Sequence, residues 1–271
     1  MVYIYLKNLK KSYLMGLIPP LFVGGFVVTI AMGWPSLQQL ILDRLSEMDN
    51  PIYKAIIGDM GLEGLGLNFQ AALFMYAGGT MNLIGLFVSI FVPVKLLSSE
   101  VDEKSLDVVL SYPISRWRYL LEKFSVYLTY NILFPLTMAV SMIGSAIILG
   151  EDYNAALIIN YALGFWLLLF GLGSIALFCT AVFLDSNRSL TAAGVVILGS
   201  YLLDSMGGLL GLKNLQLLSL FHYFKISGIL EAGFLNAKDM LPLGEVFIVI
   251  VVGFVFLVSA LYLFDRREIS Y

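Results

Sequence analysis

The chain has 271 residues, of which 59% are hydrophobic and only 13% are charged, and its mean hydropathy is +0.89. A soluble domain can bury its core with far fewer apolar residues, so this composition excludes an ordinary soluble protein and indicates a polytopic membrane protein. The formal net charge of −3 identifies no partner, and the distribution of charge along the chain is more informative.

The N-terminal residues 1–12 mix bulky apolar side chains with Lys7, Lys10 and Lys11. On a helix, the apolar residues and the lysines fall on different sides. This pattern predicts an amphipathic helix that lies at the membrane interface. The alternative is a positively charged flank that simply precedes the first span.

Six apolar stretches are long enough to cross a bilayer, since a helix needs about 20 apolar residues to cross about 30 Å of hydrocarbon. They predict spans at about 13–33, 69–94, 122–149, 156–184, 189–210 and 245–264. The alternating apolar segments of a membrane β-barrel do not occur. We therefore predict an all-α polytopic membrane protein that forms a single transmembrane domain over residues 1–271.

The connections between the predicted spans differ in length. Ser36 is expected to cap an amphipathic helix in the long first connection. Short turns at 150–154 and 185–188 would make spans three, four and five antiparallel neighbours. Residues 212–243 are apolar but interrupted by charges, which predicts short re-entrant or interfacial helices between spans five and six.

The positive charges are unevenly divided between the two sides of the predicted bundle. If the N-terminus is cytosolic, the outer side holds only five of the 16 Lys and Arg residues, namely Arg44, Lys54, Lys213, Lys225 and Lys238. The other eleven are cytosolic. This excess predicts a plasma-membrane protein with both termini inside.

The patterns of common catalytic and metal sites are missing from the sequence. It contains no G-x-x-x-x-G-K-[ST] phosphate-binding loop, and its single histidine and single cysteine, His222 and Cys179, are far apart. We expect no catalytic, cofactor-binding or metal-binding residue in this chain, and His222 is expected at the interface rather than on a metal. Asp204 lies in the fifth predicted span, where a carboxylate is either interfacial or lines a pathway.

The most heavily charged stretch is 98–124, on the predicted cytosolic side. Ser99 and Asp102 match a capping box, which predicts a lateral helix at about 99–111 between spans two and three. Its predicted apolar face consists of Val101, Leu106, Val109 and Leu110. The alternative is a solvated connector with a charge run.

The pattern E-x-x-x-x-S-L-x-x-x-L-S-x-P-I-S-R, from Glu100 to Arg116, resembles the first cytosolic loop of permeases of type-2 ATP-binding-cassette (ABC) transporters. Lys104 stands where that family commonly has glycine, and Ser105 where it has threonine. The six spans, the amphipathic N-terminus and the Phe-Asp-Arg-Arg-Glu-Ile run at 264–269 are also similar to this family. The resemblance extends over essentially the whole chain.

The resemblance implies a permease without ATPase activity of its own, most often an exporter. Such permeases pair with a second copy or a paralogue, and two separate P-loop ATPase subunits, which bind ATP and Mg²⁺, dock at the lateral coupling helix. The expected partners are thus these ATPase subunits, the second permease and the lipid bilayer, with no nucleic acid. The residues expected to contact the ATPase are Glu100, Val101, Glu103, Leu106, Asp107, Val109, Leu110 and Arg116. The substrate path would run between the two permeases along spans two and five, with Asn82, Ser200 and Asp204 as possible lining residues.

Two alternatives belong to other functional classes. A membrane scaffold or signalling subunit would dock an ATPase without moving substrate. An intramembrane enzyme or ion channel would need more polar residues in the spans than this chain has. The sequence does not identify the substrate, although apolar spans suit lipid-like, peptide or amphiphilic cargo better than small ions.

Overall fold

The computed structural model describes residues 2–47, 69–102, 115–224 and 243–267. These residues form eight α-helices and one short 3-10 helix, and no β-strand occurs among them. The elements are α1 (Val2–Lys11), α2 (Tyr13–Glu47), α4 (Phe69–Asp102), α6 (Arg116–Leu149), α7 (Ala155–Phe183), α8 (Ser186–Leu210), α9 (Lys213–Gln216), η2 (Phe221–Tyr223) and α11 (Leu243–Arg266). The predicted all-α fold class is confirmed.

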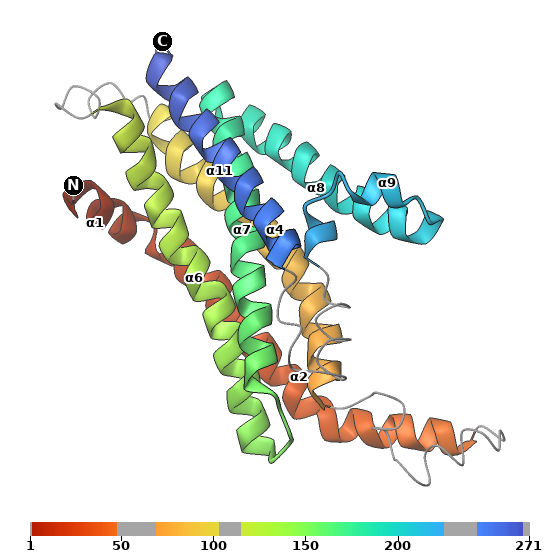
Figure 1. Ribbon diagram of the computed structural model, residues 1–271. Coiled ribbons are helices and arrows are strands. Elements are labelled where there is room, and N and C mark those ends of the chain that lie inside the picture. Colours follow the sequence, from red (N-terminus) through yellow and green to blue (C-terminus); the bar gives the residue numbers. More distant parts are fainter. Residues whose placement is uncertain (1, 48–68, 103–114, 225–242, 268–271) are drawn as a thin grey trace.

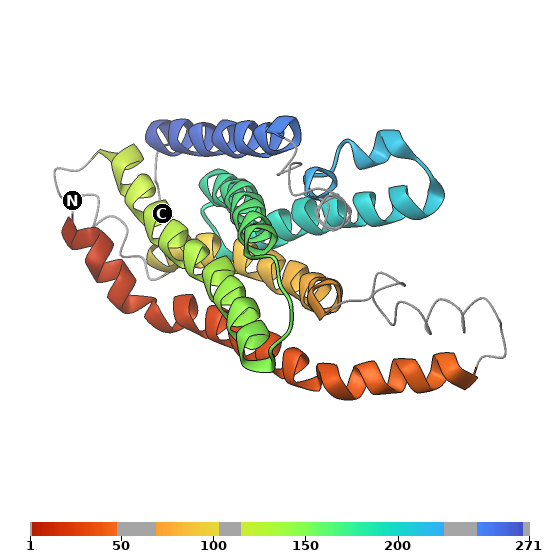
Figure 2. The same cartoon turned by 60° about the horizontal axis from the view of Figure 1, so that its bottom comes forward.

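Six of these helices are long and apolar enough to cross a membrane, and each coincides with one predicted span. They run side by side in Figure 1, with α7 in the middle. Helix α7 packs against α4, α6, α8 and α11, which explains why 78% of its most apolar window is buried. Figure 2 shows α2 and α11 on opposite sides of the bundle.

Glycines opposite aromatic rings allow the central helices to approach closely. The ring of the fully buried Tyr127 on α6 lies directly against Gly173 of α7, and its hydroxyl donates a hydrogen bond of 2.6 Å to the carbonyl of Leu169. The Phe165 ring of α7 meets Gly85 of α4 in the same way. Small residues at helix contacts are typical of membrane bundles, where close packing replaces the hydrophobic driving force.

Both short connections are present and each has a specific cap, although the second is shorter than the predicted turn at 185–188 because α8 already begins at Ser186. Gly150 ends α6 in a left-handed conformation with φ of 70°, which glycine adopts without strain. The side chain of Asn154 then accepts backbone hydrogen bonds at the start of α7. At the other end of α7, Leu184 has φ of 50°, and the Asp185 carboxylate accepts the backbone N–H of Arg188 at 2.7 Å.

Helix α2 contradicts one prediction, because it continues to Glu47 without the expected break before Ser36. Pro35 lies inside the helix and removes one backbone donor, but the residues after it are mostly good helix formers. Trp34 is buried and its ring meets that of Phe69 at 6.0 Å, which holds this part of α2 against α4. The C-terminal part of α2 projects beyond the bundle in Figures 1 and 2.

Helix α1 matches the predicted N-terminal helix, and its place at the membrane interface stays a prediction. A bend at Ser12 separates α1 from α2. The Tyr130 hydroxyl of α6 donates to the carbonyl of Leu9 at 2.9 Å and lies 3.1 Å from the Ser12 hydroxyl. Because Tyr130 bridges both sides of the bend, α6 fixes the direction in which α1 leaves the bundle.

The contact between α6 and α7 gives a test of the packing. Replacing Gly173 with Ala would place a methyl group inside the Tyr127 ring, so we expect a loss of about 1–3 kcal/mol of stability. The matched control is Gly144→Ala on α6, because among the described residues no neighbouring atom lies within 4 Å of that added methyl. Thermal unfolding in detergent micelles should show a lower midpoint for the first variant only, and equal midpoints would contradict the packing.

Candidate functional site

The candidate site is the end of the bundle where α4 and α6 lead into residues 103–114. Helix α4 ends at Asp102 and α6 begins at Arg116, so two long helices bracket the segment that resembles a coupling helix. Among the eight residues expected to contact an ATPase, five lie outside the described residues: Glu103, Leu106, Asp107, Val109 and Leu110. The structure describes Glu100, Val101 and Arg116.

The predicted capping box at Ser99 is wrong, because Ser99 is inside α4 and caps no helix. A helix start needs a preceding residue outside the helix, and here the turn before Ser99 is helical and buried. Leu97 and Ser98 are both 0% exposed in that turn, and Leu97 belongs to a cluster of buried residues with α6. Tertiary packing therefore extends the spanning helix through Val101, which is half-buried against the same cluster.

A buried ion pair joins three helices at this end. The Lys123 ammonium of α6 lies 2.7 Å from a carboxylate oxygen of Glu100 on α4, and it donates to the side-chain oxygen of Asn8 on α1 at 2.9 Å. The Tyr119 hydroxyl donates to the other oxygen of Glu100. The Lys123 side chain is 2% exposed and that of Glu100 is 14% exposed.

This arrangement is stable because each charge has close polar partners. A buried charge is costly when unpaired, and several good hydrogen bonds must offset its desolvation. The ammonium also lies 5.6 Å from the centre of the Tyr119 ring, a favourable distance for a cation–π contact. We conclude that Glu100 positions the end of α4 against α6 and α1, with both carboxylate oxygens used inside the chain.

Arg116 and Arg267 connect the start of α6 to the ends of α11 and α7. The Arg116 guanidinium donates to the backbone carbonyl of Arg267, which directly follows α11. The Arg267 guanidinium in turn donates to the carbonyls of Ala181, at 2.8 Å, and Val182 near the end of α7. These carbonyls are among the last of the helix and have no partner within it, so an arginine is favoured there.

Helix α8 is attached at the same end. The Lys95 ammonium of α4 donates to the Ser186 hydroxyl at 2.8 Å, and Ser186 is the first residue of α8. Helices α4, α6, α7, α8 and α11 thus each make a polar contact near this end, and α2 is connected to it through α1. Polar contacts therefore join the helix ends on either side of residues 103–114 to α1, to the end of α11 and, through Arg267, to α7.

A second group of polar residues lies toward the other end of α8. The Ser200 hydroxyl accepts the backbone N–H of Leu220 at 3.1 Å and lies 3.1 Å from the Ser219 hydroxyl. One turn further, an oxygen of Asp204 lies 3.7 Å from Nδ1 of His222. Their side chains are 27% and 14% exposed, respectively.

The contact between Asp204 and His222 was not foreseen from the sequence. The two side chains face each other because the chain turns back after α8 through α9 and η2. The sequence predicted short helices in this region but not the direction of the turn. Asp204 and Ser200 therefore both contact the segment that follows α8 in their own chain. The side chain of Asn82, the third possible lining residue, lies outside the described part of α4.

No group of three or more His, Cys, Asp or Glu side chains that could hold a metal ion occurs among residues 2–47, 69–102, 115–224 and 243–267. The site at the end of α4 and α6 is a set of ion-pair and backbone contacts between helices.

Comparison with known families agrees with this architecture. A family model described as ABC-2 family transporter protein matches residues 14–269. The chain belongs to this family. The match includes all six spanning helices and the segment between α4 and α6. Searches of curated proteins and of solved structures gave no match.

The ion pair can be tested by mutation. Replacing Lys123 with Met leaves the carboxylate of Glu100 without the ammonium in a largely buried position, which typically costs about 3–5 kcal/mol. The double variant Lys123→Met, Glu100→Gln should regain part of this stability, because it removes both charges. Both are measured by thermal unfolding in detergent micelles.

The matched control is Lys7→Met on α1, which makes the same change at an exposed position. It should unfold at the temperature of the unmodified chain. If Lys123→Met unfolds at that temperature too, the pair does not hold the three helices together.

Proposed function

We propose that this ABC-2 family protein is the permease subunit of an exporter that moves substrate across the membrane between two permease protomers. The energy would come from ATP hydrolysed, with Mg²⁺, by two separate P-loop ATPase subunits. The observation that carries the proposal is the family match together with the connected helix ends around residues 103–114. A partner that pushes this segment would act on α4 and α6 directly and on α1, α7 and α11 through their polar contacts.

The proposal assigns different roles to the residues that the sequence grouped together. Leu106, Val109 and Leu110 are proposed as the apolar anchors that enter a cleft of the ATPase, with Glu103 and Asp107 at its rim. Glu100 and Arg116 are proposed to position the segment, because their side chains already bind Lys123 and the carbonyl of Arg267. Val101 is half-buried and would contact the partner only in part.

The proposed second permease is supported by the exposure of α8. Only 17% of its most apolar window is buried, the lowest value among the six candidate spans of the described chain. Val195, Leu202 and Leu210 are each more than half exposed. A second copy or a paralogue that packs along α8 would cover this face and place Ser200 and Asp204 near the path.

A membrane scaffold that docks an ATPase is the second candidate, since it would need the same connected helix ends. The discriminating measurement is ATP hydrolysis by the complete complex in lipid vesicles. A transporter is expected to hydrolyse ATP faster when an amphiphilic cargo is present, and to deplete that cargo from one side of the membrane. A scaffold would do neither.

Docking can be tested with two substitutions in the proposed coupling segment. Leu106→Asp should weaken capture of the ATPase more than Asp107→Ala, because it places an unpaired charge in a desolvated cleft. Loss of one apolar anchor typically costs about 1–3 kcal/mol, which is about 5- to 150-fold in affinity. The measurement is a pull-down of the co-expressed ATPase, with membrane insertion of each permease checked separately.

Arg116→Ala provides the contrast in the same assay. It should retain docking but lower ATP hydrolysis by the complex, because Arg116 connects the segment to α11 rather than to the partner. Unchanged capture by Leu106→Asp would mean that 103–114 is a solvated connector and that the docking surface lies elsewhere.

The orientation of the chain can be tested by cysteine labelling. With Cys179 replaced by Ser, single cysteines at Asn50 and Asn236 should react from outside intact cells, and a cysteine at Ser105 only after the membrane is opened. The expectation follows from the excess of positive charge on the side of the N-terminus. Reaction of the Ser105 position with an impermeant reagent on intact cells would overturn it.

A further inference from the structure

An apolar groove lies beside the bend between α1 and α2. Its volume is about 390 Å³, within the range of about 300–1,000 Å³ that small-molecule sites occupy. One wall is α1 and α2, and the other is α6. The lining residues are Leu9, Lys10, Tyr13, Leu17, Thr129, Tyr130 and Leu133.

The groove has a fixed shape because its floor is held by hydrogen bonds. Tyr130 contacts Leu9 and Ser12, and its ring lies directly against Gly16, where no side chain could fit. The Thr129 hydroxyl is held by Tyr5 at 2.8 Å. A site formed before its ligand arrives loses less conformational entropy on binding.

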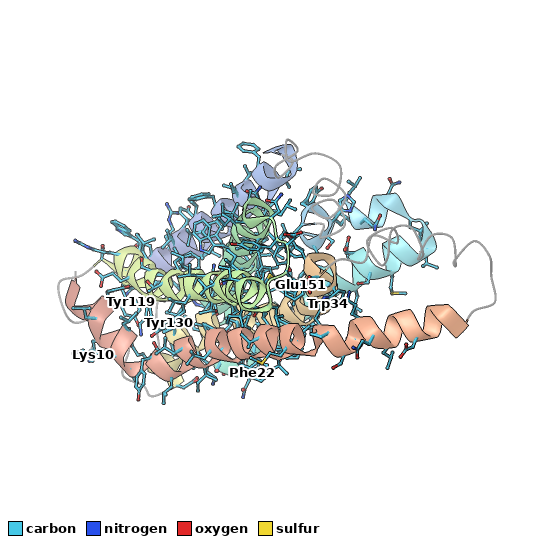
Figure 3. All side chains as sticks on the ribbon, turned by 90° about the horizontal axis from the view of Figure 1, so that it is seen from below. Lys10, Phe22, Trp34, Tyr119, Tyr130 and Glu151 are labelled. Atoms are coloured by element: carbon cyan, nitrogen blue, oxygen red, sulfur yellow. The ribbon has the colours of Figure 1, made fainter. Side chains whose placement is uncertain are left out.

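The charge at the rim of the groove is positive. Lys10 is the charged residue of its lining, and Lys7 and Lys11 are the other lysines of α1. Helix α1 contains no acidic residue, and no carboxylate pairs with Lys10 among the described residues. Lys10 and Tyr130 are labelled in Figure 3, on the same side of the bundle.

We propose that this groove binds one anionic phospholipid from the leaflet on the side of α1. An acyl chain would lie between Leu17 and Leu133, and the headgroup phosphate would pair with Lys10. The apolar walls exclude a free inorganic anion, which needs several hydrogen-bond donors. The cationic rim favours an anionic over a neutral headgroup, and basic clusters next to a spanning helix commonly act in this way. The inference is independent of transport activity.

The direct test measures lipid binding to the purified full chain in detergent by native mass spectrometry. The added probes are phosphatidylglycerol, phosphatidylcholine with the same acyl chains, and inorganic phosphate. We expect the first phosphatidylglycerol to bind several-fold more tightly than phosphatidylcholine, and inorganic phosphate not to compete. Equal binding of the two lipids, or displacement by phosphate, would overturn the proposal.

Two matched pairs of variants locate the site. Lys10→Gln should weaken phosphatidylglycerol binding about fivefold, the value of one cation near an anionic lipid. Arg188→Gln removes one exposed charge at the same end of the bundle, away from the groove, and should have no effect. Equal losses in the two variants would show a general charge effect and refute the site.

The second pair fills the groove. Leu17→Trp places a large ring where the acyl chain would lie, and should reduce phosphatidylglycerol binding to the level of phosphatidylcholine. Ile18→Trp puts the same ring on the next residue, which is 59% exposed and does not line the groove, and should bind as the unmodified chain does. Unchanged binding by Leu17→Trp would place the lipid elsewhere. A normal thermal midpoint for each variant confirms that it is folded.

Discussion

The rest of this structure depends on how the Lys123 ammonium is accommodated inside a bundle of apolar helices. A charge in that position costs several kcal/mol unless its partners are close, so the helices that supply them are held together. Glu100 near the end of α4 and Asn8 on α1 both lie within hydrogen-bonding distance of the Lys123 ammonium. The distance between the two helix ends around residues 103–114 is therefore set by an electrostatic requirement as well as by packing.

Ion-pair contacts are concentrated near one end of the bundle. Near Lys123 the contacts are polar and directional, and they include the arginine pair that ties α6 to α11 and α7. In the opposite half aromatic rings pack together, with Tyr161 stacked on Phe165 at 6.1 Å and Phe224 against both rings, near the polar group around Ser200 and Asp204. Apolar contacts have no strong directional preference, whereas hydrogen-bonded ion pairs keep their geometry.

The helices of the bundle differ in how much of their surface other helices cover. Helix α7 is enclosed, while α8 is covered on one side only, by α4, α7 and the chain that follows it. A membrane-facing surface can remain apolar at no cost, so exposure alone does not identify an interface. At α8 the exposed apolar residues adjoin the polar group around Asp204 and His222, and it is this combination that supports a second permease there. At the bend between α1 and α2, an apolar groove with Lys10 in its lining is the basis for the proposed lipid site.

The sequence by itself determined the class of the protein, its six spans and its short turns. The reason is that hydrocarbon thickness and the need to satisfy backbone hydrogen bonds act locally, on about 20 consecutive residues. The same local reasoning failed at Ser36 and Ser99, where cap signals were overridden because neighbouring turns are packed against other helices. It also placed a candidate site at the segment around Glu100, but it did not foresee the bonds that Glu100 and Arg116 make within the chain. Only the tertiary structure could decide those bonds, because Lys123 and Asn8 are 115 residues apart and Arg116 and Arg267 are 151 apart. Nothing in the local pattern of a helix specifies which distant residue will lie beside it when several apolar helices pack together.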